Sequence, residues 1–222
     1  MSLQRAAIFG GTFDPVHNGH LEAARRVQHL FAIDEMIFVP ACVPPHKRNL
    51  NITSAFHRFA MLALATESEA AFKISTVELD NPDRPYAVDT VGQLQAELGS
   101  NWRVFFVMGA DSWCELNSWH QWERLLKMCS PIVVTRPGHD IEPNEAAGAT
   151  QICDVRGLNH SQISAVLDKN DELQTFFTDA AMIDVSATSI RAAARAGWHE
   201  QLSATVPRQV ADYIEKHGLY RD

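Results

Sequence analysis

The chain has 222 residues, of which 46% are hydrophobic, and a formal net charge of −8. This size and composition predict a globular chain with a sizeable core and argue against disorder. No apolar run approaches the ~20 residues of a membrane-spanning helix, and the N-terminus lacks the order of a signal peptide, so we expect a cytoplasmic protein without a membrane partner. The acidic balance also argues against broad nucleic-acid binding, which usually requires a basic patch.

The first predicted elements are a strand and a helix joined by a polar loop. Residues 6–9 form a short apolar run, typical of a buried parallel strand. Gly10 and Gly11 then allow backbone N–H groups to approach a ligand closely. Apolar residues recur at helical spacing from about residue 19, so His17 and His20 fall at or just before a helix N-terminus. A glycine pair or a capping histidine alone is often only structural, but together they predict a phosphate-binding corner.

The rest of the chain alternates strands and helices. Strands are predicted at 36–39, 72–79, 104–108 and 132–135, and helices at 54–66, at 91–98, around 119–128, near 163–167 and from residue 186 onward. The remainder of 139–180 shows only a polar loop and a short apolar piece. This alternation predicts one α/β domain over 1–222, with a doubly wound parallel sheet and a helical C-terminal portion at about 186–222.

Ligands of such a sheet bind outside the carboxyl ends of its strands. We therefore expect the loops at 10–20, 40–48, 109–113 and 185–191 to converge on one crevice. No Gly-x-x-x-x-Gly-Lys-Ser/Thr loop is present, and Gly10–Gly11 does not begin a dinucleotide-binding glycine pattern, so kinase-like and hydride-transfer functions lose support. A phosphate site built from histidines suits attack at the α-phosphorus of a nucleoside triphosphate, where the protein positions reactants and stabilises charge.

Several motifs carry a resemblance to a known family. They are Gly10–Pro15 followed by His17–His20, the Pro-Pro-His-Lys at 44–47, the Tyr-Ala-Val-Asp-Thr at 86–90, the Gly-Ala-Asp-Ser at 109–112, the segment 185–191 and the chain end from 206 to 220. Together they resemble the bacterial nicotinate-nucleotide adenylyltransferases of the nucleotidylyltransferase superfamily. The resemblance implies a Rossmann-like fold and an enzyme of NAD biosynthesis that transfers AMP from ATP to nicotinate mononucleotide, giving deamido-NAD and pyrophosphate.

The resemblance also implies roles for individual residues. The catalytic group is His17, His20, Lys47 and Arg191, with His20 contacting the α-phosphate. The ATP-binding residues are Gly10, Gly11, Thr12, Phe13, Gly109, Asp111, Ser186, Thr188 and Ser189. The acceptor-binding residues are His46, Tyr86, Thr90 and Trp119, with Trp119 stacking on the nicotinate ring. Ala87 stands where the family usually has threonine, so a role there falls to the backbone or to Thr90.

Several of these residues also have a purely structural interpretation. Ser186 or Thr188 can be an ordinary N-cap with Arg191 solvated, Lys47 can be a solvated loop residue, and Asp111 can bond its own backbone. The tryptophans near residue 119 can belong to the core. A cation near a helix N-terminus is nevertheless unfavourable, so an anion is expected between Arg191 and that terminus.

The cofactor expected is Mg²⁺, bound with ATP and held mainly by phosphates and water, because the chain shows no carboxylate cage. Four widely spaced cysteines, at 42, 114, 129 and 153, predict neither a zinc site nor a disulfide framework. The partners expected are ATP and nicotinate mononucleotide, and the oligomeric state stays open. The alternatives are adenylyl transfer to nicotinamide mononucleotide or another phosphorylated acceptor such as phosphopantetheine, and a non-catalytic nucleotide-binding protein of the same fold.

Overall fold

The computed structural model describes residues 3–42, 52–83, 86–135, 150–169, 172–180 and 185–221. Seven strands form one sheet in the order β3-β2-β1-β4-β5-β7-β6. They are β1 (Gln4–Gly11), β2 (Glu35–Pro40), β3 (Phe72–Ile74), β4 (Trp102–Gly109), β5 (Ser130–Val134), β6 (Gln151–Asp154) and β7 (Gln174–Thr178). Every recorded strand pair is parallel, which confirms the predicted doubly wound parallel sheet.

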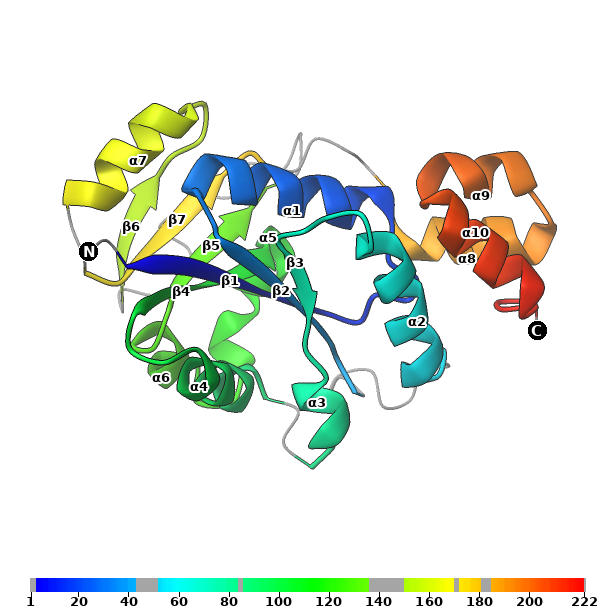
Figure 1. Ribbon diagram of the computed structural model, residues 1–222, viewed down its shortest axis with the longest axis horizontal. Helices are drawn as coiled ribbons and strands as arrows, with labels where there is room; N and C mark the ends of the chain where they lie inside the picture. The colour runs from blue at the N-terminus through cyan, green and yellow to red at the C-terminus, as the bar shows by residue number, and fades with distance from the viewer. Residues whose placement is uncertain are drawn as a thin grey trace.

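Helices cover both faces of this sheet (Figure 1). They are α1 (Asn18–Phe31), α2 (Ala55–Thr66), α3 (Val77–Asp80), α4 (Ala87–Leu98), α5 (Ala110–Cys114), α6 (Trp122–Leu126), α7 (His160–Lys169), α8 (Ala187–Ala196), α9 (His199–Thr205) and α10 (Arg208–Lys216), with a 3₁₀ turn, η2, at Leu116–Ser118. In Figure 1, α1 and α7 lie on one face, α4 and α6 on the other, and α8–α10 gather beyond one end of the sheet. Among the described helices, none is long and apolar enough to cross a membrane.

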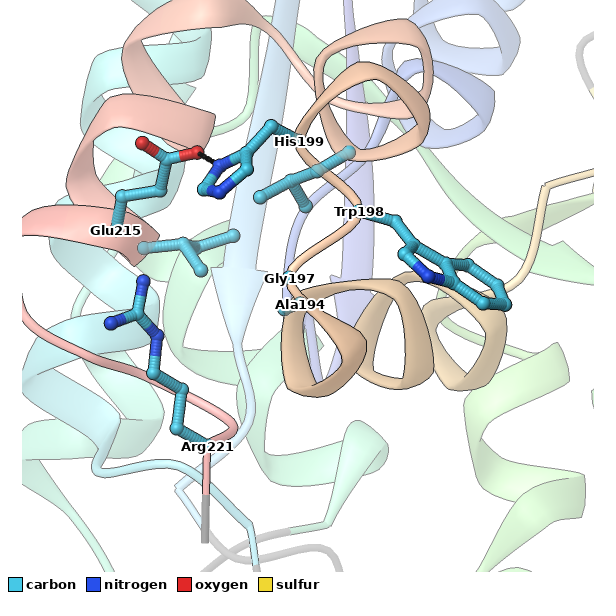
Figure 2. A pocket seen from close by; sticks show the side chains of 8 residues that line it. Ala194, Gly197, Trp198, His199, Glu215 and Arg221 are labelled. Carbon is cyan, nitrogen blue, oxygen red and sulfur yellow. Dashed lines mark hydrogen bonds and ion pairs between the residues drawn. The ribbon is translucent and has the colours of Figure 1, made fainter.

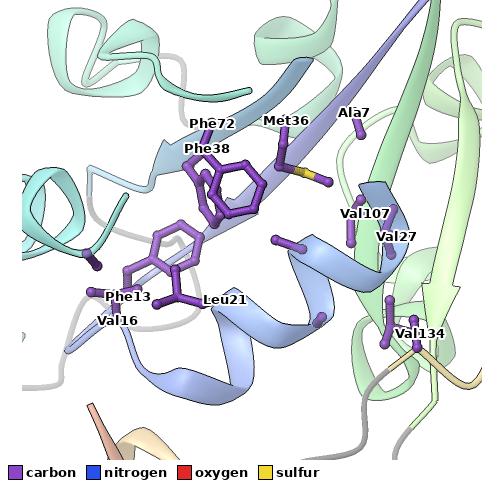
Figure 3. Close-up of a cluster of buried hydrophobic side chains, with 14 of the residues drawn as sticks. Ala7, Phe13, Val16, Leu21, Val27, Met36, Phe38, Phe72, Val107 and Val134 are labelled. Carbon is purple, nitrogen blue, oxygen red and sulfur yellow. The ribbon is translucent and has the colours of Figure 1, made fainter. Parts of the chain in front are cut away.

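The core consists of two hydrophobic clusters, one on each face of the sheet. Successive strand residues point to opposite faces, so Ala7 of β1 belongs to one cluster while Ala6 and Ile8 belong to the other. Figure 3 shows the first cluster, where Phe13 and Phe38 pack near α1. The C-terminal helices add Ile190, Leu202, Val210 and Ile214 to this same cluster. The C-terminal helices therefore share this core with the sheet, and the single domain over 1–222 stays a prediction.

Three sequence predictions differ from the structure in detail. The strand predicted over 72–79 ends at Ile74, and its second half is α3. The helix predicted around 119–128 is the shorter α6, preceded by η2. Within 139–180 the helix near 163–167 is confirmed as α7, but β6 and β7 were not predicted, because β6 is a short edge strand with exposed ends and β7 is rich in polar residues.

Candidate active site

The site is organised around the carboxyl end of β1, an interior strand between β2 and β4. Phe9 of β1 pairs with Phe38 of β2 and with Val107 of β4. Gly11 follows Phe9 by two residues and Gly109 follows Val107 by two, so both glycines lie at the same edge of the sheet. The strand predicted at 6–9 therefore continues through Gly10–Gly11 instead of ending before them. The loops that follow neighbouring parallel strands are brought together here, as the predicted crevice requires.

Gly11 makes room for the ring of Phe13. A Cβ on Gly11 would lie 3.0 to 3.2 Å from three atoms of that ring. Phe13 itself has a φ of 47°, in the left-handed region that costs an ordinary residue roughly 1–2 kcal/mol. Its ring is 2% exposed and lies edge-on to His20 at 5.0 Å between centroids. A bulky residue held in this conformation is typical of a functional site that the surrounding structure stabilises.

His17 and His20 form a reciprocal pair at the start of α1. The Nδ1 atom of His17 accepts a hydrogen bond from the backbone N–H of His20, and Nδ1 of His20 accepts one from the N–H of His17, both at 3.3 Å. The two rings stack with centroids 3.6 Å apart. Because both Nδ1 atoms accept, each neutral imidazole carries its proton on Nε2. The histidines therefore cap the helix and also hold the tautomer whose Nε2–H can donate to a phosphate oxygen.

The first turns of α8 bring Arg191 to the same loop. Ser186 is the N-cap, and its hydroxyl oxygen accepts from the N–H of Ser189 at 3.2 Å. Arg191 lies in the second turn of α8, and its Nη1 donates to the carbonyl of Asp14 at 2.8 Å. Its Nη2 donates to the hydroxyl of Thr188 at 3.3 Å. The loops at 10–20 and 185–191 are thus joined directly, and Thr188 and Ser189 are exposed beside them.

Asp14 links this loop to distant parts of the chain. Its carboxylate is 5% exposed and accepts hydrogen bonds from the hydroxyl of Tyr220 at 2.8 Å and from the N–H of Thr53 at 3.2 Å. Burial, together with the negative charge of Asp14, raises the pKa of Tyr220 above its ordinary value. The Tyr220 hydroxyl therefore remains protonated and donates to Asp14 over the physiological pH range.

Arg58 is a buried residue of this region that the sequence analysis did not single out. It is 1% exposed and donates to four backbone carbonyls, those of Thr12, Ala41, Cys42 and Thr53. Burial lowers its pKa, an effect that the nearby Asp14 carboxylate opposes. The burial of α2 does not follow apolar character alone, because Phe56 is 82% exposed and the buried face is centred on Arg58. The sequence did hold a signal for this burial: Arg58 stands three residues before Met61 and four before Leu62, so the three side chains share one face of the helix.

The predicted acceptor residues lie around the start of α4. Tyr86 is the N-cap residue of α4, and its ring contacts the ring of His120 at 4.3 Å between centroids. The neighbouring Trp119 is half-buried and lies edge-on to Phe106 at 6.2 Å. The segment carrying Trp119 is therefore adjacent to the N-terminus of α4, as a shared pocket requires.

Thr90 is 3% exposed and donates its hydroxyl to Glu78 at 2.9 Å. Glu78 was also missed by the sequence analysis. Burial raises its pKa, while bonds from the Thr90 hydroxyl and from the backbone N–H of Cys42 favour the ionised form. A substrate contact by Thr90 stays a prediction, since the recorded bonds of its hydroxyl run to Glu78 and to the carbonyl of Tyr86.

Gly109 and Asp111 are exposed at the junction of β4 and α5, next to the end of β1. Lys47 and His46 lie outside the described residues. Within the described part of the chain, no group of three or more His, Cys, Asp or Glu side chains is placed to hold a metal ion.

The described part of the chain contains cavities at the C-terminal helices and beside α4. The first, of about 10 Å³, is lined by residues of the C-terminal helices, among them His199, which is bonded to Glu215 (Figure 2). It holds at most one water molecule. The other, of about 360 Å³, lies between α3, α4 and α6 and is lined by Val77, Asn81, Val88, Asp89, Thr90, Gly92, Gln93 and Arg124. Among the predicted acceptor residues that the structure describes, Thr90 is the one that lines this larger cavity.

Comparison with known proteins decides the family. Residues 8–193 match the family model described as cytidylyltransferase-like. The chain belongs to this family. A relative from Symbiobacterium thermophilum, named "probable nicotinate-nucleotide adenylyltransferase", is 37% identical over 98% of this chain and 96% of its own length. One of the same name from Pseudomonas aeruginosa is 35% identical over 98% of both chains.

Solved structures share the fold. The Plasmodium falciparum nicotinic acid mononucleotide adenylyltransferase complexed with APC has a TM-score of 0.68 at 19% identity, covering 98% of this chain and 97% of that one. The same protein complexed with NaAD has a TM-score of 0.66 at 18% identity. The predicted fold and the resemblance to nicotinate-nucleotide adenylyltransferases are confirmed.

Proposed function

We propose that the protein transfers AMP from MgATP to nicotinate mononucleotide, giving deamido-NAD and pyrophosphate. The observation that carries the reaction class is the His17–His20 pair, whose Nδ1 atoms both accept backbone hydrogen bonds at the start of α1, in the segment that follows the interior strand β1. The near full-length similarity to relatives named for this activity supports the choice of acceptor.

The reaction needs positioning and charge stabilisation more than a base. A phosphate oxygen of nicotinate mononucleotide forms a new bond to the α-phosphorus of ATP, while the bond from that phosphorus to the bridging oxygen breaks. The electron pair leaves with pyrophosphate. The attacking monoester is already ionised near neutral pH, so no strong base is required. Negative charge on the equatorial oxygens of the α-phosphate is what the Nε2–H groups of His17 and His20 would stabilise.

Arg191 and the N-terminus of α8 are suited to the β- and γ-phosphates. The helix N-terminus favours an anion through its N–H groups and dipole, and Ser189 and Thr188 add exposed hydroxyls there. Mg²⁺ enters as part of the substrate MgATP, since phosphate oxygens and water can complete its coordination without a protein cage. We assign Gly109 and Asp111 to the ribose side, and Lys47 and His46 to the phosphates and the acceptor, as the family motif implies.

Preference for the acid over the amide has a physical basis at α4. Nicotinate carries a carboxylate where nicotinamide carries a neutral amide. A carboxylate placed at the N-terminus of α4, beside Tyr86 and Trp119, gains about 0.3–1 kcal/mol from the helix dipole. That energy corresponds to at most about a fivefold preference, and direct bonds from backbone N–H groups would add to it.

The test is pyrophosphate release from MgATP with nicotinate mononucleotide and, separately, with nicotinamide mononucleotide. The wild-type protein is expected to release pyrophosphate faster with the acid. Replacement of His20 by alanine should reduce kcat about 10²–10³-fold, the usual loss when a donor to the transition state is removed. His29→Ala is the matched control, because His29 is an exposed residue in the last turn of the same helix.

Other outcomes of this assay would change either the acceptor or the reaction assigned to the protein. Release with the amide alone would keep the mechanism and change the acceptor. Release with neither acceptor, together with unchanged ATP affinity in His20→Ala, would indicate another acceptor or a nucleotide-binding protein without this activity.

A further inference from the structure

Two arginines hold the backbone on either side of the strained residue Phe13. Nη1 of Arg58 donates to the carbonyl of Thr12 at 2.6 Å, and Nη1 of Arg191 donates to the carbonyl of Asp14 at 2.8 Å. The carbonyls of the residues before and after Phe13 are therefore held by α2 and α8. A residue in the left-handed region persists only when its surroundings determine its conformation, and these two bonds supply that determination.

The conformation of Phe13 in turn bears on His20. The Phe13 ring lies edge-on to the His20 ring at 5.0 Å, and it packs against the face of Gly11 that a side chain would otherwise occupy. A shift of the Thr12 carbonyl would rotate the Phe13 backbone and move its ring against the imidazole. Contacts thus run from Arg58 through Thr12 and Phe13 to the histidine that we assign to the α-phosphate.

Arg58 also fixes the carboxyl end of β2. Its Nη2 donates to the carbonyls of Ala41 at 2.6 Å and Cys42 at 2.8 Å. The backbone N–H of Cys42 bonds to Glu78, and Glu78 accepts from the Thr90 hydroxyl of α4. The backbone of Cys42 is thereby held at both polar groups: its carbonyl by the buried guanidinium of Arg58 and its N–H by the buried carboxylate of Glu78. These bonds connect the loop between β1 and α1, called here the histidine loop, to helix α4, which carries predicted acceptor residues.

We propose that Arg58 is a positioning residue for adenylyl transfer: it holds the Thr12–Asp14 loop and the end of β2 in register, so that His20 keeps its orientation and tautomer. This inference rests on the proposed function for its catalytic consequence. Only arginine suits the position, because a planar fork of five N–H donors reaches four carbonyls in three segments, whereas lysine has three donors on one nitrogen.

The experiment compares Arg58→Lys with Arg103→Lys. Arg103 is the matched control, because it is also a buried arginine, 9% exposed, that donates to backbone carbonyls, those of Leu167 and Glu172. It lies near the amino end of β4, away from the histidine loop. For each variant, kcat and KM are measured well below its melting temperature, and the tautomers of His17 and His20 are read from ¹⁵N NMR spectra of histidine-labelled protein.

Both variants are expected to lower the melting temperature. Arg58→Lys alone should reduce kcat, by about 10–100-fold, with KM for either substrate changed less than about threefold, since a small misplacement of a catalytic group costs this much. Arg58→Lys alone should also shift the His20 signals away from the pure Nε2–H tautomer. Should Arg58→Lys not fold, Arg58→Gln and Arg103→Gln take their places in the same comparison.

The proposal is overturned if the Arg58 variant keeps wild-type kcat and the wild-type histidine spectrum. It is also overturned if the Arg58 and Arg103 variants lose the same kcat with both spectra unchanged, because Arg58 would then act through general stability alone. If the wild-type protein transfers AMP to neither mononucleotide, the proposed function fails, and the histidine spectra still decide whether Arg58 positions His20.

Discussion

His17 and His20 show that a structural and a functional interpretation of one residue need not compete. From the sequence, a histidine at a helix start is either a cap or a catalyst. In the structure the capping bonds use Nδ1 of each ring, and this leaves the proton of the neutral ring on Nε2. The cap therefore leaves the Nε2–H group as the ring donor that the proposed function directs at phosphate.

The room for a Cβ atom is smaller at Gly11 than at Gly10, so alanine substitutions at the two positions form a matched pair of variants. In Gly11→Ala the new Cβ would lie 3.0 Å from the buried ring of Phe13, whereas in Gly10→Ala the nearest atom is 3.7 Å away, an ordinary contact. We expect Gly11→Ala to lower the free energy of unfolding by about 1–3 kcal/mol through overpacking, and to reduce kcat as the ring moves against His20. Urea unfolding and steady-state kinetics measure both effects. Equal stability of the two variants would contradict this account.

Glu78 predicts a specific pH dependence of stability. Burial raises its pKa in the folded state above 4.5, so the folded protein binds the proton more tightly than the unfolded chain does. The resulting stabilisation is fully present below pH 4.5 and is lost as pH rises through the folded-state pKa. The unfolding free energy of the wild-type protein minus that of Glu78→Gln should therefore fall with rising pH in this window. A difference that stays flat or rises would contradict the raised pKa.

At the scale of elements, periodicity located most helices and strands but not always the face that they bury. The helix at 54–66 was predicted with nearly correct bounds, yet Phe56 is exposed and Arg58 is buried. Apolar periodicity cannot reveal this, because the buried face of α2 is selected by hydrogen bonds from Arg58 to carbonyls of other segments. Strands β6 and β7 escaped prediction for a related reason, since their polar residues pair in the sheet without forming an apolar pattern.

The N-cap of α8 offers a test at this scale. Ser186 accepts a hydrogen bond from Ser189, while Ser54, the N-cap of α2, makes no capping bond with its side chain. Ser186→Ala should lower the free energy of unfolding by about 0.5–2 kcal/mol, and Ser54→Ala should change it little. Because α8 carries Arg191, fraying of its first turn should also raise KM for ATP. Thermal unfolding and ATP titration measure these effects, and a cost from Ser54→Ala as large as that from Ser186→Ala would refute the distinction.

At the scale of the whole molecule, the sequence motifs indicated where the candidate site lies, because they fall at the ends of parallel strands and the starts of helices. The meeting of the His17–His20 and Arg191 segments follows from that rule, whereas the order of the strands in the sheet was not predicted. The bonds that fix those residues could not be predicted in the same way. Many are bonds between a side chain and a backbone carbonyl or carboxylate far away in the chain, and neither periodicity nor local spacing records such partners.

The hydrogen bond from Tyr220 to Asp14 spans 206 positions and ties the chain end to the loop between β1 and α1, which is the catalytic loop under the proposed function. Tyr220→Phe removes a donor to a buried carboxylate, which should lower the free energy of unfolding by about 1.5–3 kcal/mol. Because the same carboxylate holds Thr53 and lies next to Phe13, kcat should fall as well. Tyr213→Phe is the control, since the Tyr213 hydroxyl bonds to His57 between α10 and α2 and not to the catalytic loop.

The control variant is expected to lose stability and keep its kcat, so the two effects separate in one pair of proteins. Thermal unfolding and pyrophosphate release measure them side by side. If Tyr220→Phe also keeps wild-type kcat, the C-terminal contact stabilises the fold without acting on the catalytic loop. If both variants lose kcat alike, the C-terminal helices act on the site through the packing of α10 on α2, and the Asp14 bond has no separate part in catalysis.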